Sequence, residues 1–188
     1  GEYCYGCTDS TAVNYNPDAI YDDGSCILPD ITVPDDYGTI QAALNAVGAG
    51  QTIYVLAGTY YENIVWPETA DIKLIGEDRE TTIIDANTNV YGIEIEGNEI
   101  NYLVNHNTLI QGFTIRNAGS SGIYSYRSNP TLKDLIIEDN QGNNYGVGIY
   151  MTTNEDDDNI PDSLFIDNII VRNNISTTQA AGFYFRMD

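Results

Sequence analysis

Hydrophobic and polar residues alternate in three stretches of the chain that share one pattern. Residues 111–117 read QGFTIRN, residues 133–139 read KDLIIED, and residues 167–173 read DNIIVRN. A short β-type run precedes each stretch, and a third run, GIY, GIY or GFY, follows each at residues 122–124, 148–150 and 182–184. Alternation bounded by Asn, Asp and Gly predicts β-strands. Three strands per repeat, in a fixed order, predict a parallel β-helix whose coils stack on one another.

The same alternation predicts which side chains form the core. It points three aliphatic or aromatic pairs inward as stacked columns. These pairs are Phe113 and Ile115, Leu135 and Ile137, and Ile169 and Val171. Outward on the same strands lie Arg116, Glu138 and Arg172, which we expect to form a ladder of alternating charge. At the corner that follows, Asn117, Asp139 with Asn140, and Asn173 with Asn174 predict a structural asparagine ladder.

The third run of each repeat predicts a row of exposed tyrosines. Tyr124, Tyr150 and Tyr184 occupy equivalent positions, with Glu94 ahead of them. We expect them to face outward in register as a flat apolar ribbon about 10 Å long. Three interpretations remain open: the ribbon stacks on sugar rings, it contacts a neighbouring subunit, or the rings stabilise only one another.

One helix is predicted before the repeats. Apolar residues at positions 40, 43, 44 and 47 form a helical stripe, with Thr39 as N-cap and Gly48 as the stop. We expect this helix to cap the first coil of the solenoid. Short strands are predicted after it at residues 52–56, 60–66, 72–75 and 81–85, separated by turns.

The first residues differ from the rest in cysteine content and hydrophobic pattern, so we predict two domains, residues 1–29 and 30–188. All three cysteines, Cys4, Cys7 and Cys26, lie in the first segment, which lacks a regular apolar period. This clustering is the disulfide pattern of exported proteins, and it leaves one cysteine over or bonded outside the chain. Zinc is the competing interpretation, but the segment has no second close cysteine pair and the chain has one His.

The same segment contains many oxygen-bearing side chains. Asn14, Asn16 and Asp18 lie at alternate positions of a turning loop, which is how hard cations such as Ca²⁺ are bound, and Asp22 and Asp23 follow on a tight turn. The candidate ligands are Asp9, Asn14, Asn16, Asp18, Asp22 and Asp23. The alternative is that these side chains form Asx turns around a disulfide loop, without metal.

Charge restricts the partners. Twenty-eight acidic residues against seven basic ones give a net charge of −21, which argues against nucleic acid and anionic membranes. The hydrophobic runs are too short to insert in a membrane. A surface this acidic is either simply solvated or holds divalent cations, and the same two interpretations apply to the acidic insertion at residues 154–161.

Residues 6–26, GCTDSTAVNYNPDAIYDDGSC, resemble a small module of secreted bacterial surface proteins that use the type IX secretion route. They resemble thrombospondin type 3 calcium repeats more loosely. Copies of the module often carry Cys where this chain has Val13, which leaves the partner of Cys4 open. On this basis we expect a Cys7–Cys26 disulfide, with Cys4 free or linked to another chain or a preceding module.

Residues 33–66, 72–77 and 81–85 resemble the opening of pectin lyase-like right-handed β-helix proteins, including pectin methylesterases. The resemblance continues to the end of the chain and implies the fold. Methylesterases should carry a Gln-Ala-Val-Ala-Leu-like strand and an Asp-Thr-Leu-Tyr-like strand in the next coils. Here those regions read SGIYSY at residues 121–126 and PTLKDL at residues 130–135. Both catalytic carboxylates of the pattern are missing, which favours a role other than catalysis.

The sequence therefore predicts an all-β right-handed parallel β-helix with a capping helix and a small disulfide module. We expect an extracellular structural or adhesive protein of a bacterial cell surface. The chain stops in mid-coil, so we expect that either the natural protein continues and completes the β-helix or another molecule covers that end. In the second case we expect copies to assemble through residues 183–185 and the face formed by Tyr124, Tyr150 and Tyr184. Neighbouring surface proteins are other possible partners. The alternative is a polysaccharide-binding or polysaccharide-degrading protein of lyase or esterase type.

Overall fold

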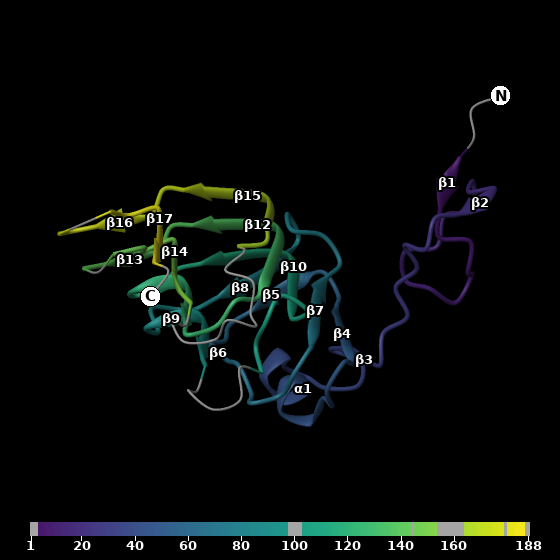
Figure 1. The fold of residues 1–188 in the computed structure, drawn as a ribbon, viewed down its shortest axis with the longest axis horizontal. Coiled ribbons are helices and arrows are strands. Elements are labelled where there is room, and N and C mark those ends of the chain that lie inside the picture. The colour runs from purple at the N-terminus through teal and green to yellow at the C-terminus, as the bar shows by residue number, and fades with distance from the viewer. Residues whose placement is uncertain (1–3, 98–102, 144, 154–163, 179, 187–188) are drawn as a thin grey trace. The chain divides into compact units, whose positions relative to one another are not determined.

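The chain divides into two compact units, residues 1–30 and residues 31–188, and each is described by itself. The structure, a computed structural model, describes residues 4–97, 103–143, 145–153, 164–178 and 180–186 (Figure 1). In the first unit, β1 (Tyr5–Gly6) pairs in parallel with β2 (Tyr21–Asp22). Few of its side chains are buried; Cys7 and Ala12 are the hydrophobic ones among the described residues. A unit with so small a core depends on turns and covalent linkage.

The second unit is a parallel β-helix. Its larger sheet has the order β15-β12-β10-β7-β4-β3, with β8 pairing both β10 and β5. These strands are β3 (Ile31–Val33), β4 (Thr52–Val55), β5 (Gly58–Tyr60), β7 (Lys73–Gly76), β8 (Thr82–Asp85), β10 (Leu109–Arg116), β12 (Thr131–Glu138) and β15 (Ile166–Arg172). Every pairing in it is parallel, and strands follow one another in chain order, which is the signature of stacked coils.

Each coil then contributes a strand to a second sheet, in which the strands are again stacked in chain order. It runs β17-β14-β11-β9-β6, again with parallel pairing throughout. Its strands are β6 (Ile64–Val65), β9 (Tyr91–Glu96), β11 (Ser121–Tyr126), β14 (Ile149–Thr152) and β17 (Phe183–Arg186). A third, short pair, β13 (Gln141–Gly142) with β16 (Ile175–Ser176), extends outward beyond these sheets (Figure 1).

Two strand predictions are wrong in their boundaries. The first two runs of each repeat form one continuous strand, as in β10 and β12, and not two. Each such strand bends at one residue with left-handed backbone, namely Gly112, Asp134 and Asn168, with φ of 81°, 49° and 53°. Conversely, residues 60–66 are not one strand, because β5 ends at Tyr60 and β6 begins at Ile64 beyond a corner.

The predicted core columns are confirmed. Phe113, Ile115, Leu135 and Ile137 are fully buried. Ile169 and Val171, on β15, are partly buried and pack against the same core. The register explains the stacking, because Phe113 pairs with Leu135 and Leu135 with Ile169. Burying aliphatic side chains in this way stabilises the fold by roughly 1.5–3 kcal/mol for each.

Helix α1 (Ile40–Ala46) begins and packs as predicted. The Thr39 hydroxyl accepts a hydrogen bond from the Ala42 amide, and Ile40, Ala43, Leu44 and Val47 are buried. Glu62 contributes a contact that the sequence does not reveal. Its two carboxylate oxygens accept hydrogen bonds from the backbone amides of Ile40 and Gln41, each at 3.0 Å. The first turn of the helix is therefore bound by a residue of the next coil as well as by its own N-cap.

The Gln41 side chain meets the edge strand of the second sheet. Its Nε2 donates to the Val65 carbonyl and its Oε1 accepts from the Val65 amide, at 3.0 and 2.7 Å. A side-chain amide thus takes the place that a neighbouring strand would have beside β6. Among the described residues no helix is long and apolar enough to span a bilayer.

Candidate functional site

A row of stacked tyrosine rings runs across the second sheet. Tyr124, Tyr150 and Tyr184 lie in register, with ring centroids 5.1 and 5.2 Å apart and ring planes within 13°. Tyr91 stacks on Tyr124 at 4.5 Å, and Tyr145 stacks on Tyr184 at 5.0 Å. We call these five residues the tyrosine row. The register predicted for the first three is what the structure shows, and Glu94 pairs with Tyr124 as expected.

The inner rings of the row present their edges to the surroundings, and within the described part of the chain only the two end rings have an uncovered face. The face of each inner ring is covered by the next ring, so the flat apolar ribbon expected from the sequence does not describe it. Burial, and then the neighbouring Tyr91 and Tyr150, raise the pKa of Tyr124 to about 12. The phenol therefore keeps its proton at neutral pH and remains a hydrogen-bond donor.

Charged groups flank the row. Burial, followed by repulsion from Glu96, raises the pKa of the Glu94 carboxyl above its ordinary value. The Arg127 guanidinium lies over the Tyr126 ring at 5.2 Å, and Tyr126 in turn lies 6.4 Å from Tyr124. Both signs of charge are thus present beside the row.

The predicted outward charge ladder is present and longer than expected. Arg172 forms an ion pair with Glu138 at 2.7 Å, and Arg116 forms one with Asp85 at 2.9 Å. Since Arg116 also pairs in register with Glu138, the four residues occupy successive coils. Asp85 was missed because its coil lacks the repeat motif.

The asparagine ladder consists of two residues. Asn140 Nδ2 donates to Asn174 Oδ1 at 2.9 Å, while Asn140 Oδ1 accepts from the Ala118 amide at 2.9 Å. Asn117, Asp139 and Asn173 serve another purpose, because they turn the corner with left-handed backbone, at φ of 59°, 54° and 55°. The Asn117 side chain donates to Asp85.

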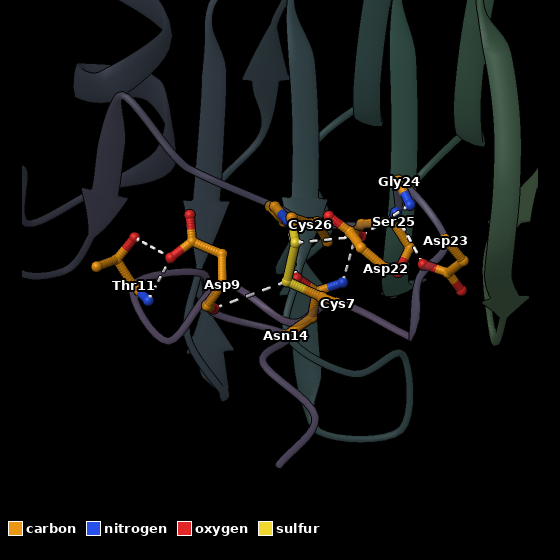
Figure 2. Close-up of a disulfide and its surroundings, with 10 residues drawn as sticks. Cys7, Asp9, Thr11, Asn14, Asp22, Asp23, Gly24, Ser25 and Cys26 are labelled. Atoms are coloured by element: carbon orange, nitrogen blue, oxygen red, sulfur yellow. Dashed lines mark hydrogen bonds between the residues drawn. A yellow bond between two sulfur atoms is a disulfide. The ribbon is translucent and has the colours of Figure 1, made fainter. Parts of the chain in front are cut away.

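The six candidate calcium ligands lie in the first unit, where side-chain oxygens of five of them, all but Asp18, accept hydrogen bonds from backbone amides. Figure 2 shows Asp9, Asn14, Asp22 and Asp23. Asp9 Oδ1 accepts from Thr11 N, Asn16 Oδ1 from Asp18 N, Asp22 Oδ1 from Gly24 N and Asp23 Oδ1 from Ser25 N. These are Asx turns. The Thr11 side chain, and then its backbone amide, lower the pKa of Asp9, and the Ser25 side chain, and then its amide, lower the pKa of Asp23.

Asn14 connects distant parts of the loop. Its Nδ2 donates to the Ser25 carbonyl and its Oδ1 accepts from the Ile27 amide. Within the described residues, no three His, Cys, Asp or Glu side chains converge as a metal site would require. The second oxygens of Asp9, Asp22 and Asp23 and the carboxylate of Asp18 accept no hydrogen bond from another described residue, and calcium remains a prediction here.

The structure pairs Cys7 with Cys26, as expected, and leaves Cys4 outside any disulfide (Figure 2). The Cα atoms lie 4.7 Å apart, and the bond closes a loop with a sequence separation of 19 residues. The regions that correspond to the methylesterase pattern lie on β11 and β12. In β12 the Asp134 carboxylate accepts a hydrogen bond from Asn168 at 2.6 Å. The acidic insertion at residues 154–161 lies outside the described residues.

No protein-family model matches the chain, and no curated protein sequence matches it significantly. Among solved structures, a pectin methylesterase from carrot is similar with a TM-score of 0.45 and 18% identity, over 70% of this chain and 52% of that one. A pectin methylesterase variant in complex with a hexasaccharide has a TM-score of 0.41 and 14% identity, over 80% of this chain and 63% of that one. The chain thus spans about half the length of the carrot enzyme.

Proposed function

We propose that this protein is an extracellular structural or adhesive component that associates with its own copies through the tyrosine row. The observation that carries the proposal is the continuous stack of five rings with spacings of 4.5–5.2 Å. Rings that are already held in place lose little side-chain entropy on binding, so their hydroxyls and edges form a preorganised face. Tyrosine is also enriched in the cores of protein interfaces.

A second copy of this chain is the partner that fits this face. The hydroxyls of the row repeat at the spacing of the coils, and another copy carries the same row with the same spacing. Two rows related by a twofold axis would meet along their length, as isologous interfaces do. Glu94 and Arg127 lie beside the row and carry opposite charges, so in such an arrangement Glu94 of one copy would meet Arg127 of the other.

Net charge sets the conditions for association. Copies that each carry −21 repel one another, and salt screens this repulsion over a Debye length of about 8 Å at physiological ionic strength. Association through the row should therefore strengthen as salt increases, which is the opposite of an assembly driven by opposite charges. The Cys7–Cys26 disulfide supports an oxidising location outside the cytoplasm.

Three finer features belong to the same proposal. The solenoid winds in a right-handed sense, as strand–crossover–strand connections nearly always do. Helix α1 caps its first coil, which is supported by the buried stripe and by the Gln41 contact with Val65. Calcium binds the loop of the first unit, which is supported by its oxygen-rich turns.

Sedimentation of the full chain tests the association. We expect dimers or larger species to increase with protein and salt concentration, and Tyr150→Ser to abolish them. Tyr150→Phe keeps the stacking and removes one hydroxyl, so it should weaken association less. Tyr37→Ser, at an exposed tyrosine outside the row, is the matched control and should change nothing. A wild-type chain that stays monomeric at millimolar concentration in high salt would refute the proposal.

A further inference from the structure

A polar groove lies at the corner between the two large sheets, separate from the tyrosine row. Its volume is about 730 Å³, within the range of small-molecule sites. Six of the exposed side chains along it come from four coils. They are Tyr61, Asn87, Asp139, Gln141, Asn143 and Thr177, and we call this the corner groove.

The groove forms because the connections between the two sheets differ in length from coil to coil. In one coil the chain turns from β10 to β11 within the four residues 117–120, of which Asn117, Ala118 and Gly119 form the floor. In the next two coils the chain first forms β13 and β16, which extend outward as a wall (Figure 1). Gln141 N donates to the Ala118 carbonyl and Thr177 N donates to the Gly142 carbonyl, so the wall is fixed to the floor.

Charge excludes ionic ligands from the groove. No Lys or Arg is among its lining residues, whereas Asp85 and Asp139 are, so an anion would meet only repulsion. A divalent cation is also disfavoured. The Asp85 carboxylate is 5% exposed and already accepts hydrogen bonds from Arg116, Asn117 and the Asn87 amide. One remaining carboxylate, Asp139, is too few for a hard cation, which takes six or more oxygen ligands.

The exposed groups instead match a neutral ligand with many hydroxyls. The side chains of Asn87, Gln141 and Asn143 form no hydrogen bond with any other described residue. Each carries both a donor and an acceptor, as every hydroxyl group does. Tyr61 is 69% exposed, and its ring supplies an apolar surface at one side. Most small-molecule pockets are lined mainly by apolar side chains, so a lining this polar selects a polar ligand.

We infer that the corner groove binds a short neutral oligosaccharide, laid across neighbouring coils along the solenoid axis. The lining residues of successive coils are about 5 Å apart, so a ligand of several sugar rings is needed to contact both Tyr61 and the β13–β16 wall. The ring of Tyr61 packs against one sugar face, while the amides of Asn87 and Gln141 bind hydroxyls of the neighbouring rings.

Calorimetry on the full chain tests this inference. The probes are tetrasaccharides of glucose, mannose, galactose and xylose, with tetragalacturonate as the acidic probe. We expect saturable binding of at least one neutral probe and none of tetragalacturonate. Tyr61→Ala and Gln141→Ala should each weaken binding tenfold or more, and Thr177→Trp, which fills the groove, should abolish it.

Control variants separate this site from the tyrosine row. Tyr150→Phe and Tyr37→Ala should leave oligosaccharide affinity unchanged, and circular dichroism should show that every variant folds. The inference is wrong if no neutral probe binds, if tetragalacturonate binds better, or if the Tyr61 and Gln141 variants bind as wild type. Loss of binding in Tyr150→Phe would place the ligand on the row and also overturn it. None of these outcomes depends on self-association.

Discussion

Residues 1–30 and residues 31–188 reach an ordered structure by different means. In the first unit the Oδ1 atoms of Asp9, Asn16, Asp22 and Asp23 accept hydrogen bonds from backbone amides two residues further along, and the longer side-chain bonds, those of Asn14 and Asn16, span 11 to 13 residues. In the second unit the side chains of Asn140 and Arg172 bind partners 34 residues away. The first unit therefore relies on local turns and one covalent bond, whereas the second relies on contacts between coils. The effect of a destabilising change should therefore stay local in the first unit and extend to neighbouring coils in the second.

The largest expected effect is in the solenoid core. Phe113→Ala removes the largest fully buried side chain and should lower the free energy of unfolding by about 3–5 kcal/mol. Hydrogen exchange should show the loss in β10, β12 and β7 together and leave residues 1–30 unaffected. Leu28→Ala, at a residue 55% exposed in the first unit, is the control and should cost almost nothing. Equal losses in both units would show that they unfold as one.

Reducing the disulfide is the reciprocal experiment. Loss of the Cys7–Cys26 bond should destabilise the first unit by about 3 kcal/mol, because the unfolded chain regains the conformational entropy that closing a loop of this length removes. Limited proteolysis after reduction should then cut within residues 8–25 while the solenoid resists. Cys4→Ser should have no such effect, because Cys4 forms no disulfide. Peptide mapping that found a Cys4–Cys26 bond would contradict the assignment.

A smaller loss is expected from the asparagine ladder. Asn140→Ala leaves the Ala118 amide and the Asn174 side chain without their partner in a buried corner. Stability should fall by about 1–3 kcal/mol in urea unfolding. Asn143→Ala, at an exposed residue of the same corner, should change stability by less than about 0.5 kcal/mol. An equal effect for both would remove the ladder as a stabilising element.

Calcium should give the smallest effect. At a free concentration tenfold above the dissociation constant, Ca²⁺ would stabilise the first unit by about 1.4 kcal/mol. Chelation should then lower the unfolding temperature of residues 1–30 and leave the solenoid unchanged. Asp23→Asn should weaken the effect, while Asp30→Asn, outside the candidate ligands, should not. Calorimetry that detects no calcium binding to the oxidised chain would refute the site.

The repeat explains how much of this structure was predictable. The motifs around Phe113, Leu135 and Ile169 gave the coil register and the inward columns because each side chain has its equivalent one coil away. Tyr124, Tyr150 and Tyr184 were found by the same signal. Tyr91 and Tyr145 were not, because they reach the row from positions outside the shared motif.

The corner groove was not predictable for a different reason. Its side chains come from residues as far apart as Tyr61 and Thr177, and the sequence places them in ordinary turns or, as with Tyr61, in a predicted strand. The sequence of a turn does not show how far that corner extends outward from the sheets. That projection depends on β13 pairing with β16, which is a contact between coils. The different roles of Asn117 and Asn140, which the sequence placed in the same ladder, were also not predictable. Asn117 has a left-handed backbone and turns the corner, whereas Asn140 faces inward and bonds to the Ala118 amide.

The bond between Glu62 and the start of α1 has a consequence for the order of folding. A helix of seven residues is too short to persist by itself, and the amides of Ile40 and Gln41 depend on a carboxylate 22 and 21 residues further along. During synthesis from the N-terminus, α1 therefore leaves the ribosome before the group that completes it. The helix gains these two bonds only when Glu62, between β5 and β6, is in place, so we expect helix formation and the ordering of that segment to be one kinetic event. Nucleation of the solenoid thus waits for at least one full coil of chain.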